Sequence, residues 1–85
     1  MIIVYDIGVE RVNRVRVLLR QYLNWIQNSV FEGELTKSAL REVEEKLREI
    51  IVPEEDSVVV YVLRDERLLK RKFIGEPKAE TSNIL

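Results

Sequence analysis

Asp6 is the first residue whose type and position in the chain indicate chemistry. It follows the apolar run 2–5, which predicts a strand, and Gly8 then precedes an arginine-bearing segment with helical periodicity. A carboxylate at the point where a strand ends and a helix begins occupies a common position for phosphate or metal chemistry. The alternative is that Asp6 caps the helix or forms the turn, since Asp is common in both roles.

Arginines in the segment that follows could bind phosphates beside Asp6, and the candidates are Arg11, Arg14 and Arg16. Helical spacing places Arg14 and Arg16 on opposite borders of the apolar stripe, whereas Arg11 falls within the sector of that stripe. A charge cannot lie unpaired in the core, so we expect Arg11 to emerge at the end of the sheet near Asp6. The alternative is that these arginines only form a solvated helix face.

The composition excludes several classes of chemistry. The chain has 85 residues with no Cys and no His, which excludes disulfides, thiolate catalysis and zinc bound by these residues. The net charge is −1, yet basic and acidic residues are segregated along the chain, which permits a nucleic-acid-binding face. The sequence contains no run of about 18 apolar residues, so we predict no membrane span. A chain without Cys suits a reducing compartment, and we expect a cytoplasmic protein.

The pattern of apolar residues predicts one small α+β domain. It indicates a helix over 9–23, a strand or hairpin over 24–35 that turns at Glu32–Gly33, a helix capped by Thr36 and a strand over 57–63. Strand, helix, hairpin, helix and strand in this order are typical of a ferredoxin-like βαββαβ sandwich, in which two helices cover one side of an antiparallel sheet.

The C-terminal region extends this arrangement. Residues 72–75 predict a short extra C-terminal strand, so we assign 1–75 to the ferredoxin-like domain. Residues 76–85 form a polar tail that ends in two apolar residues. Such a tail could dock as an edge strand on a partner subunit.

The first and last strands of the sandwich predict a homodimer. Residues 2–5 and 57–63 are apolar on both faces, but two helices cover only one face of a sheet. A second copy of the sheet would cover the other face through a two-fold interface. If the axis passes near Asp6, two carboxylates face each other and repel unless they share a proton or a cation. A bound Mg²⁺ or Mn²⁺ would relieve this repulsion.

Three motifs together resemble one known family. The segments 3–7 (IVYDI), 13–15 (NRV) and 26–33 (IQNSVFEG) are similar to those of the small CRISPR-associated proteins called "Cas two", and the resemblance covers nearly the whole chain. It implies a ferredoxin-like homodimer whose aspartates face each other. It also implies Mg²⁺- or Mn²⁺-dependent cleavage of single-stranded RNA or double-stranded DNA, and a partner, the CRISPR-associated integrase, in spacer acquisition.

The resemblance carries over to single residues. Asp6 matches the metal-binding, catalytic aspartate, and Tyr5 matches the residue before it, which we include in the predicted catalytic site. Arg14 matches a basic residue of the first helix, and Ser29 and Phe31 match the second-strand signature. The chain departs from the family at Trp25, where members often have a basic residue.

The leading hypothesis is therefore a metal-dependent endonuclease that acts in spacer acquisition for antiviral defence, in the cytoplasm of a prokaryote. One alternative is a scaffold that binds DNA and the integrase without cleavage. Another is a toxin-like ribonuclease on the same fold. A ferredoxin-like sensor of small molecules ranks last, because the glycines are scattered and form no ligand loop.

Overall fold

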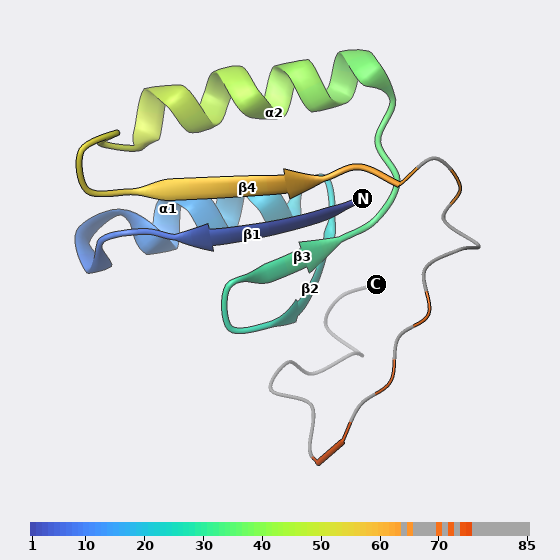
Figure 1. Cartoon of the computed structure of the whole chain (residues 1–85). Coiled ribbons are helices and arrows are strands. Elements are labelled where there is room, and N and C mark those ends of the chain that lie inside the picture. Colours follow the sequence, from blue (N-terminus) through green and yellow to red (C-terminus); the bar gives the residue numbers. More distant parts are fainter. Residues whose placement is uncertain (64, 66–69, 71, 73, 76–85) are drawn as a thin grey trace.

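The computed structural model describes residues 1–63, 65, 70, 72 and 74–75, and it forms a sheet with helices on one side (Figure 1). The strands within these residues are β1 (Ile2–Asp6), β2 (Asn24–Gln27), β3 (Val30–Glu32) and β4 (Ser57–Tyr61), and the helices are α1 (Val9–Arg20) and α2 (Lys37–Ile50). The strand order is β2-β3-β1-β4, and each neighbouring pair is antiparallel. The ferredoxin-like βαββαβ fold predicted from the sequence is therefore confirmed.

The core lies between the sheet and the two helices. Ile3 on β1 pairs with Phe31 on β3 and with Val60 on β4, so these side chains share one face of the sheet. Ile3 and Phe31 are completely buried against apolar residues of both helices. The helical residues of this core are Val15, Leu18, Leu19, Val43 and Leu47. Burial of this apolar surface is the main force that holds the helices on the sheet.

The sheet face opposite the helices, called the outer face below, remains partly exposed. Val4 pairs with Val30 and with Val59 across β1, and this register places all three on the outer face. Val59 and Tyr61 on β4 are 46% and 56% exposed. The helices thus explain why one face of β1 and β4 is apolar, but they do not cover the other face. A second copy over the outer face stays a prediction.

The hairpin of β2 and β3 turns at Asn28–Ser29, so the predicted turn at Glu32–Gly33 was wrong. Asn28 has a φ of 43°, a left-handed conformation that Asn tolerates better than most residues. Gly33 serves another purpose, because a Cβ there would lie 3.0 Å from a methyl carbon of Leu23. The glycine therefore permits a close approach of two segments and marks no hairpin turn.

The helices begin and end at identifiable residues. Helix α1 ends at Arg20, three residues before the predicted Leu23, and the N–H of Gln21 then donates to the carbonyl of Leu18 at 3.1 Å. This tighter last turn sends the chain into β2. The side chain of Thr36 caps α2 as predicted. No helix in the described part of the chain is long and apolar enough to cross a bilayer.

The C-terminal predictions fall mostly outside the described residues. Strand β4 ends at Tyr61, earlier than the predicted boundary of 63. Of the predicted extra strand, Lys72, Ile74 and Gly75 are described and none of these three lies in a strand. Residue 73 and the tail 76–85 lie outside the described residues. The division of the chain at residue 75 and the docking of the tail on a partner therefore stay predictions.

Candidate functional site

Asp6 lies at the end of β1, where it pairs with Ser57, the first residue of β4. It follows Val4 on the outer face, because alternate residues of a strand point to the same side. Asp6 is exposed, and its carboxylate forms no hydrogen bond or ion pair with another described residue. The structure thus presents one free carboxylate at the end of an apolar surface, where it could bind a cation.

Tyr5 points to the opposite side of β1 from Asp6. Its side chain is buried against the helices, and its hydroxyl donates to the carbonyl of Asn28 at 3.4 Å. The Phe31 ring lies 6.1 Å from the Tyr5 ring, and the Tyr5 N–H donates to the carbonyl of Ser29 at 3.1 Å. The structure therefore brings Tyr5 together with the second-strand signature, as packing around the hairpin turn, and separates it from the Asp6 carboxylate.

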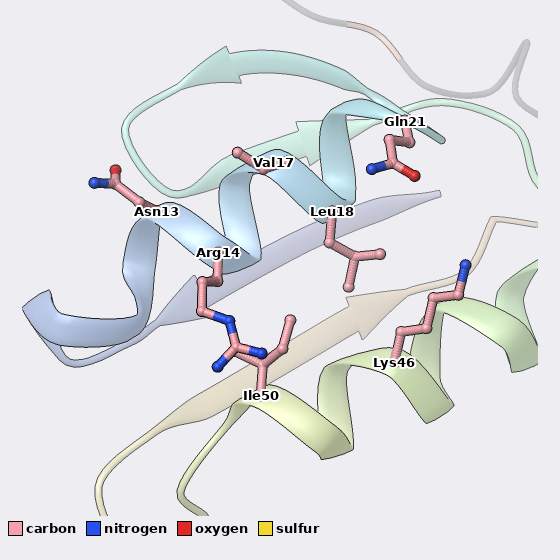
Figure 2. Close-up of a pocket in the computed structure, with 7 residues that line it drawn as sticks. All are labelled: Asn13, Arg14, Val17, Leu18, Gln21, Lys46 and Ile50. Atoms are coloured by element: carbon pink, nitrogen blue, oxygen red, sulfur yellow. The ribbon is translucent and has the colours of Figure 1, made fainter.

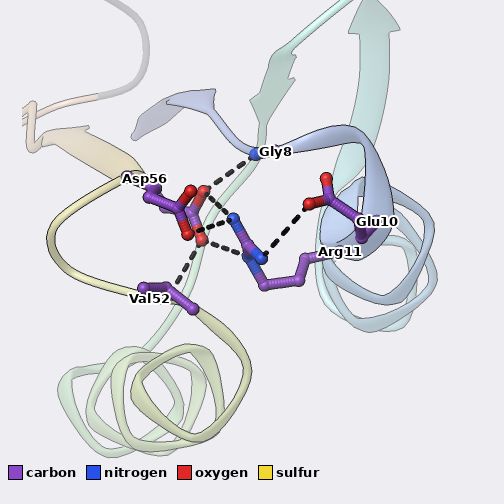
Figure 3. Close-up of polar contacts among 6 residues, drawn as sticks. Gly8, Glu10, Arg11, Val52 and Asp56 are labelled. Carbon is purple, nitrogen blue, oxygen red and sulfur yellow. Dashed lines mark hydrogen bonds and ion pairs between the residues drawn. The ribbon is translucent and has the colours of Figure 1, made fainter.

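Arg11 forms a buried ion pair with Asp56, the residue directly before β4 (Figure 3). Arg11 Nε donates to Asp56 Oδ2 at 2.6 Å, and Arg11 Nη2 donates to Oδ1 at 2.9 Å. The same carboxylate accepts from the N–H groups of Gly8 and Val52, each at 2.8 Å. We call Gly8, Arg11, Val52 and Asp56 the Asp56 network. Its carboxylate is completely buried and accepts four hydrogen bonds, so its charge is well compensated.

The Asp56 network explains the charge state of both partners. The hydrogen bond from Arg11, with the N–H groups of Val52 and Gly8, holds the pKa of Asp56 well below its usual range, despite the opposing effect of burial. The same hydrogen bond raises the pKa of Arg11. The Arg11 side chain is only 15% exposed. Arg11 is thus paired near the Asp6 end of the sheet, as expected from its helical position. Its guanidinium binds the Asp56 carboxylate of the same chain.

Two further arginines of α1 lie over the ring of Trp25. The guanidinium carbon of Arg16 is 5.6 Å from the ring centroid, and that of Arg20 is 4.7 Å away. Such cation–π contacts fix the direction of flexible side chains. Neither arginine has an ion pair with a described carboxylate, and Arg16 Nε is buried without a hydrogen-bond partner. This Trp25 cluster (Arg16, Arg20 and Trp25) is therefore positively charged and uncompensated within the described residues.

Arg14 lies in a third environment, over a shallow groove between α1 and α2 (Figure 2). Its side chain extends toward Ile50 of α2, and Lys46 lies farther along the same helix. The groove has a volume of about 440 Å³. The three arginines predicted as one phosphate-binding group thus lie in three different environments. Only Arg16 is accompanied by a second uncompensated arginine.

Comparison with known proteins identifies the family. The sequence profile described as "CRISPR associated protein Cas2" matches residues 1–71. The chain belongs to the Cas2 family. The "CRISPR-associated endoribonuclease Cas2" of Methanosarcina acetivorans is 52% identical over 85 residues, which cover 100% of this chain and 98% of that protein. The protein of the same name from Pyrococcus furiosus is 53% identical over 85 residues, with the same 100% and 98% coverage.

A solved structure supports the same assignment. The structure described as "Crystal structure of cas2" superposes with a TM-score of 0.84 at 48% sequence identity, covering 93% of this chain and 88% of that chain. The resemblance predicted from the three sequence motifs is therefore confirmed. The segment that the Cas2 profile matches, residues 1–71, includes every described strand and helix from β1 to β4.

A single copy of this Cas2 chain offers few ligands for a metal ion among its described residues. No group of three or more His, Cys, Asp or Glu side chains in the described residues is arranged to hold a metal ion. The free carboxylate of Asp6 is a hard oxygen ligand of the kind that Mg²⁺ prefers, and Mg²⁺ often uses only one or two carboxylates together with water. Asp6 therefore fits as one carboxylate ligand of such a site.

Asp56 and the Trp25 cluster are features of this Cas2 chain that were not predicted from the sequence. Asp56 had one usable signal, because Arg11 required a buried partner near the end of the sheet and Asp56 is the acid that adjoins the last strand. Arg16 and Arg20 are four residues apart and so share a helix face. Their contact with Trp25 depends on how β2 lies beside α1, which the sequence alone does not give.

Proposed function

We propose that this Cas2 chain is a metal-dependent endonuclease in which Asp6 holds Mg²⁺ or Mn²⁺. The observation that carries the proposal is the exposed Asp6 carboxylate without a partner among the described residues, at the end of β1. The relatives from Methanosarcina acetivorans and Pyrococcus furiosus are named endoribonucleases, which favours RNA as the substrate. Double-stranded DNA is the alternative substrate.

The proposed nuclease acts as a homodimer through the outer face of the sheet. The exposed apolar side chains of Val59 and Tyr61 support this interface, since their burial against a second copy would be favourable. A two-fold axis near the end of β1 would bring the two Asp6 carboxylates together. Their mutual repulsion would then favour binding of a divalent cation between them.

The residues of the chain have distinct tasks in this proposal. Asp6 holds the metal ion, which when bound would acidify a water and polarise the phosphodiester. Arg16 and Arg20 bind phosphates of the nucleic acid, because they are uncompensated and already oriented by Trp25. Tyr5 is buried on the other side of β1, and we assign it no contact with the substrate.

A second candidate function is a DNA-binding scaffold that joins the CRISPR-associated integrase during spacer acquisition without cutting. The observation that favours it is the lack of an acidic cluster suited to a metal ion among the described residues. A single carboxylate per chain is a sparse donor set for catalysis. The Trp25 cluster would bind the DNA backbone in this role as well, and Asp6 would be dispensable.

A cleavage assay separates the two candidates. Labelled single-stranded RNA and double-stranded DNA are incubated with the protein in Mg²⁺, Mn²⁺ or EDTA, and the wild type is compared with Asp6→Asn. Glu54→Gln is the matched control, because Glu54 is also an exposed acid and has no role in the proposal. We expect metal-dependent cleavage of RNA by the wild type and the control, and cleavage at the EDTA level by Asp6→Asn. Both variants should remain dimers in light scattering.

Two other results are informative. Equal cleavage by Asp6→Asn and the wild type would show that the metal site is elsewhere and would contradict the proposal. No cleavage of either substrate by a dimeric wild type that still binds DNA would favour the scaffold.

A further inference from the structure

The Asp56 network connects to the strand end that carries Asp6. Asp6 pairs with Ser57, and Asp56 is the residue before Ser57. On the other strand, Gly8 follows Asp6 by two residues, and its N–H donates to Asp56 Oδ1 at 2.8 Å. The backbone around Asp6 is therefore fixed from both sides, by the pairing of β1 with β4 and by the Asp56 carboxylate.

The geometry of Gly8 and Arg11 shows how closely this junction is packed. A Cβ at Gly8 would clash with Arg11 Nη2, so a larger residue there would displace the guanidinium. Gly8 is also the N-cap of α1, and no side chain caps this helix. The Asp56 carboxylate accepts the Gly8 N–H instead, and a negative charge near a helix N-terminus is favourable. Asp56 thus holds together the end of β1, the start of α1 and the loop after α2.

We propose that Asp56 is a positioning residue for the metal-binding carboxylate of Asp6. The inference rests on the proposed function. Asp6 is exposed, and its carboxylate forms no hydrogen bond or ion pair with the described residues, so the backbone that carries it sets its position. That backbone is held through Gly8 and Ser57 by the Asp56 network. Ligand atoms of a metal site must be held to within about 0.5 Å, and supporting residues supply this order.

Arg11 also contributes to the position of Asp6 in this inference. The guanidinium donates to both oxygens of Asp56 and so fixes the plane of the carboxylate. The N–H of Val52 also donates to Oδ2, at 2.8 Å, and so further restrains the carboxylate. Arg11 therefore acts on the metal site through Asp56, with no contact to the substrate.

Binding of Mn²⁺ measured by electron paramagnetic resonance tests the inference without reference to activity. The free Mn²⁺ signal is followed during titration of the wild type, Asp56→Asn and Asp6→Asn. Val43→Ala is the control for lost stability, because Val43 is a completely buried core residue of α2 that takes no part in the Asp56 network. All samples are kept well below their melting temperatures. If Asp56→Asn does not fold, Arg11→Lys replaces it, since Lys retains the charge but loses the paired hydrogen bonds.

We expect Asp56→Asn to weaken Mn²⁺ binding about tenfold or more, as other supporting residues of metal sites do. Val43→Ala should bind Mn²⁺ like the wild type despite its lower melting temperature. The Mn²⁺ concentration for half-maximal cleavage should rise in Asp56→Asn, with the rate recovered at saturation. Wild-type affinity in Asp56→Asn, or in Arg11→Lys where it replaces that variant, with binding lost in Asp6→Asn, would overturn the positioning role alone. Equal affinity of the wild type and Asp6→Asn would overturn the metal site and this inference together.

Discussion

The two ends of α1 use arginine in opposite ways. Near its start, Arg11 is 15% exposed and pairs with the buried carboxylate of Asp56. In its second half, Arg16 and Arg20 lie over Trp25 and have no ion pair with a described carboxylate. The helix is the same and the residue type is the same. The difference shows that the partner supplied by the tertiary fold decides whether an arginine stabilises the protein or remains available to a ligand.

The first end has the larger structural consequence. Removal of one member of a buried ion pair leaves the other as an uncompensated charge in a low-dielectric environment, which is strongly destabilising. An arginine over an aromatic ring contributes far less, because its removal leaves no buried carboxylate without its cation. Variants at the two ends should therefore separate stability from nucleic-acid binding.

Arg11→Ala should have the largest effect, and the effect should be on stability. Because the variant leaves the Asp56 carboxylate buried without its cation, we expect the melting temperature to fall by roughly 10 °C or more. Arg14→Ala is the matched control, since Arg14 is an exposed arginine of the same helix. Its stability should remain within about 0.5 kcal/mol of the wild type. Equal melting temperatures for the two variants would contradict the structural importance of the Asp56 network.

The pH dependence of stability should reflect the Arg11–Asp56 pair at the start of α1. The folded-state pKa of Asp56 is lowered by Arg11, so its contribution to stability is present above the ordinary aspartate pKa of about 4 and is lost as the pH falls below it. Two other acids, Glu10 and Glu55, also lie near Arg11. The informative quantity is therefore the difference between wild type and Asp56→Asn in urea unfolding.

This difference in unfolding free energy should be largest near neutral pH and should shrink as the pH falls from about 5 toward 3. A difference that stays constant over this range would mean that the charge of Asp56 contributes little. A difference that grows at low pH would contradict the direction of the pKa shift.

Arg16→Ala and Arg20→Ala, in the second half of α1, should change the binding of nucleic acid. If each arginine contacts one phosphate, the slope of log affinity against log salt should become shallower by about one unit per variant. Arg41→Ala on α2 is the control, because Arg41 is exposed and has no assigned contact. Filter binding of single-stranded RNA at several salt concentrations measures the slope. Unchanged slopes would place the nucleic-acid face elsewhere, such as the basic stretch 64–72 of the sequence.

Trp25→Leu should have the smallest effect. It removes the cation–π contacts, which are worth about 0.5–1 kcal/mol at exposed sites, while both arginines keep their charge. RNA affinity should therefore fall less than in Arg20→Ala. Since Trp25 is the only tryptophan of the chain, its fluorescence reports binding directly in the wild type. Fluorescence that does not respond to RNA at concentrations that saturate filter binding would separate the Trp25 cluster from the binding face.

The sequence was sufficient for features that depend on local pattern. The apolar periodicity predicted the order of elements and the fold, and the cap at Thr36 was correct because capping depends on adjacent residues. The hairpin turn was misplaced because two short sequences, Asn28–Ser29 and Glu32–Gly33, both suit a turn. Pairing of β3 with β1 selects between them, and that pairing is not local.

The candidate site was only partly predictable for the same reason. The position of Asp6 at the end of β1 followed from the apolar run 2–5, which ends just before this residue. The need of Arg11 for a partner was evident from its place in the apolar sector, but the identity of Asp56 required the packing of the loop after α2 against the start of α1. Likewise, Trp25 meets the arginines of α1 only because β2 lies at the edge of the sheet beside that helix.

The sheet order also determines when during synthesis the Asp6 end can form. β1 is the first strand to leave the ribosome, yet it lies between β3 and β4, and β4 is the last strand of the described sheet. The contact of Gly8 with Asp56 spans 48 residues of chain. A nascent chain that ends before Asp56 therefore holds Asp6 on a strand with one free edge and an unpaired Arg11. The contacts that hold the Asp6 end are therefore complete only after Asp56 and β4 have been translated.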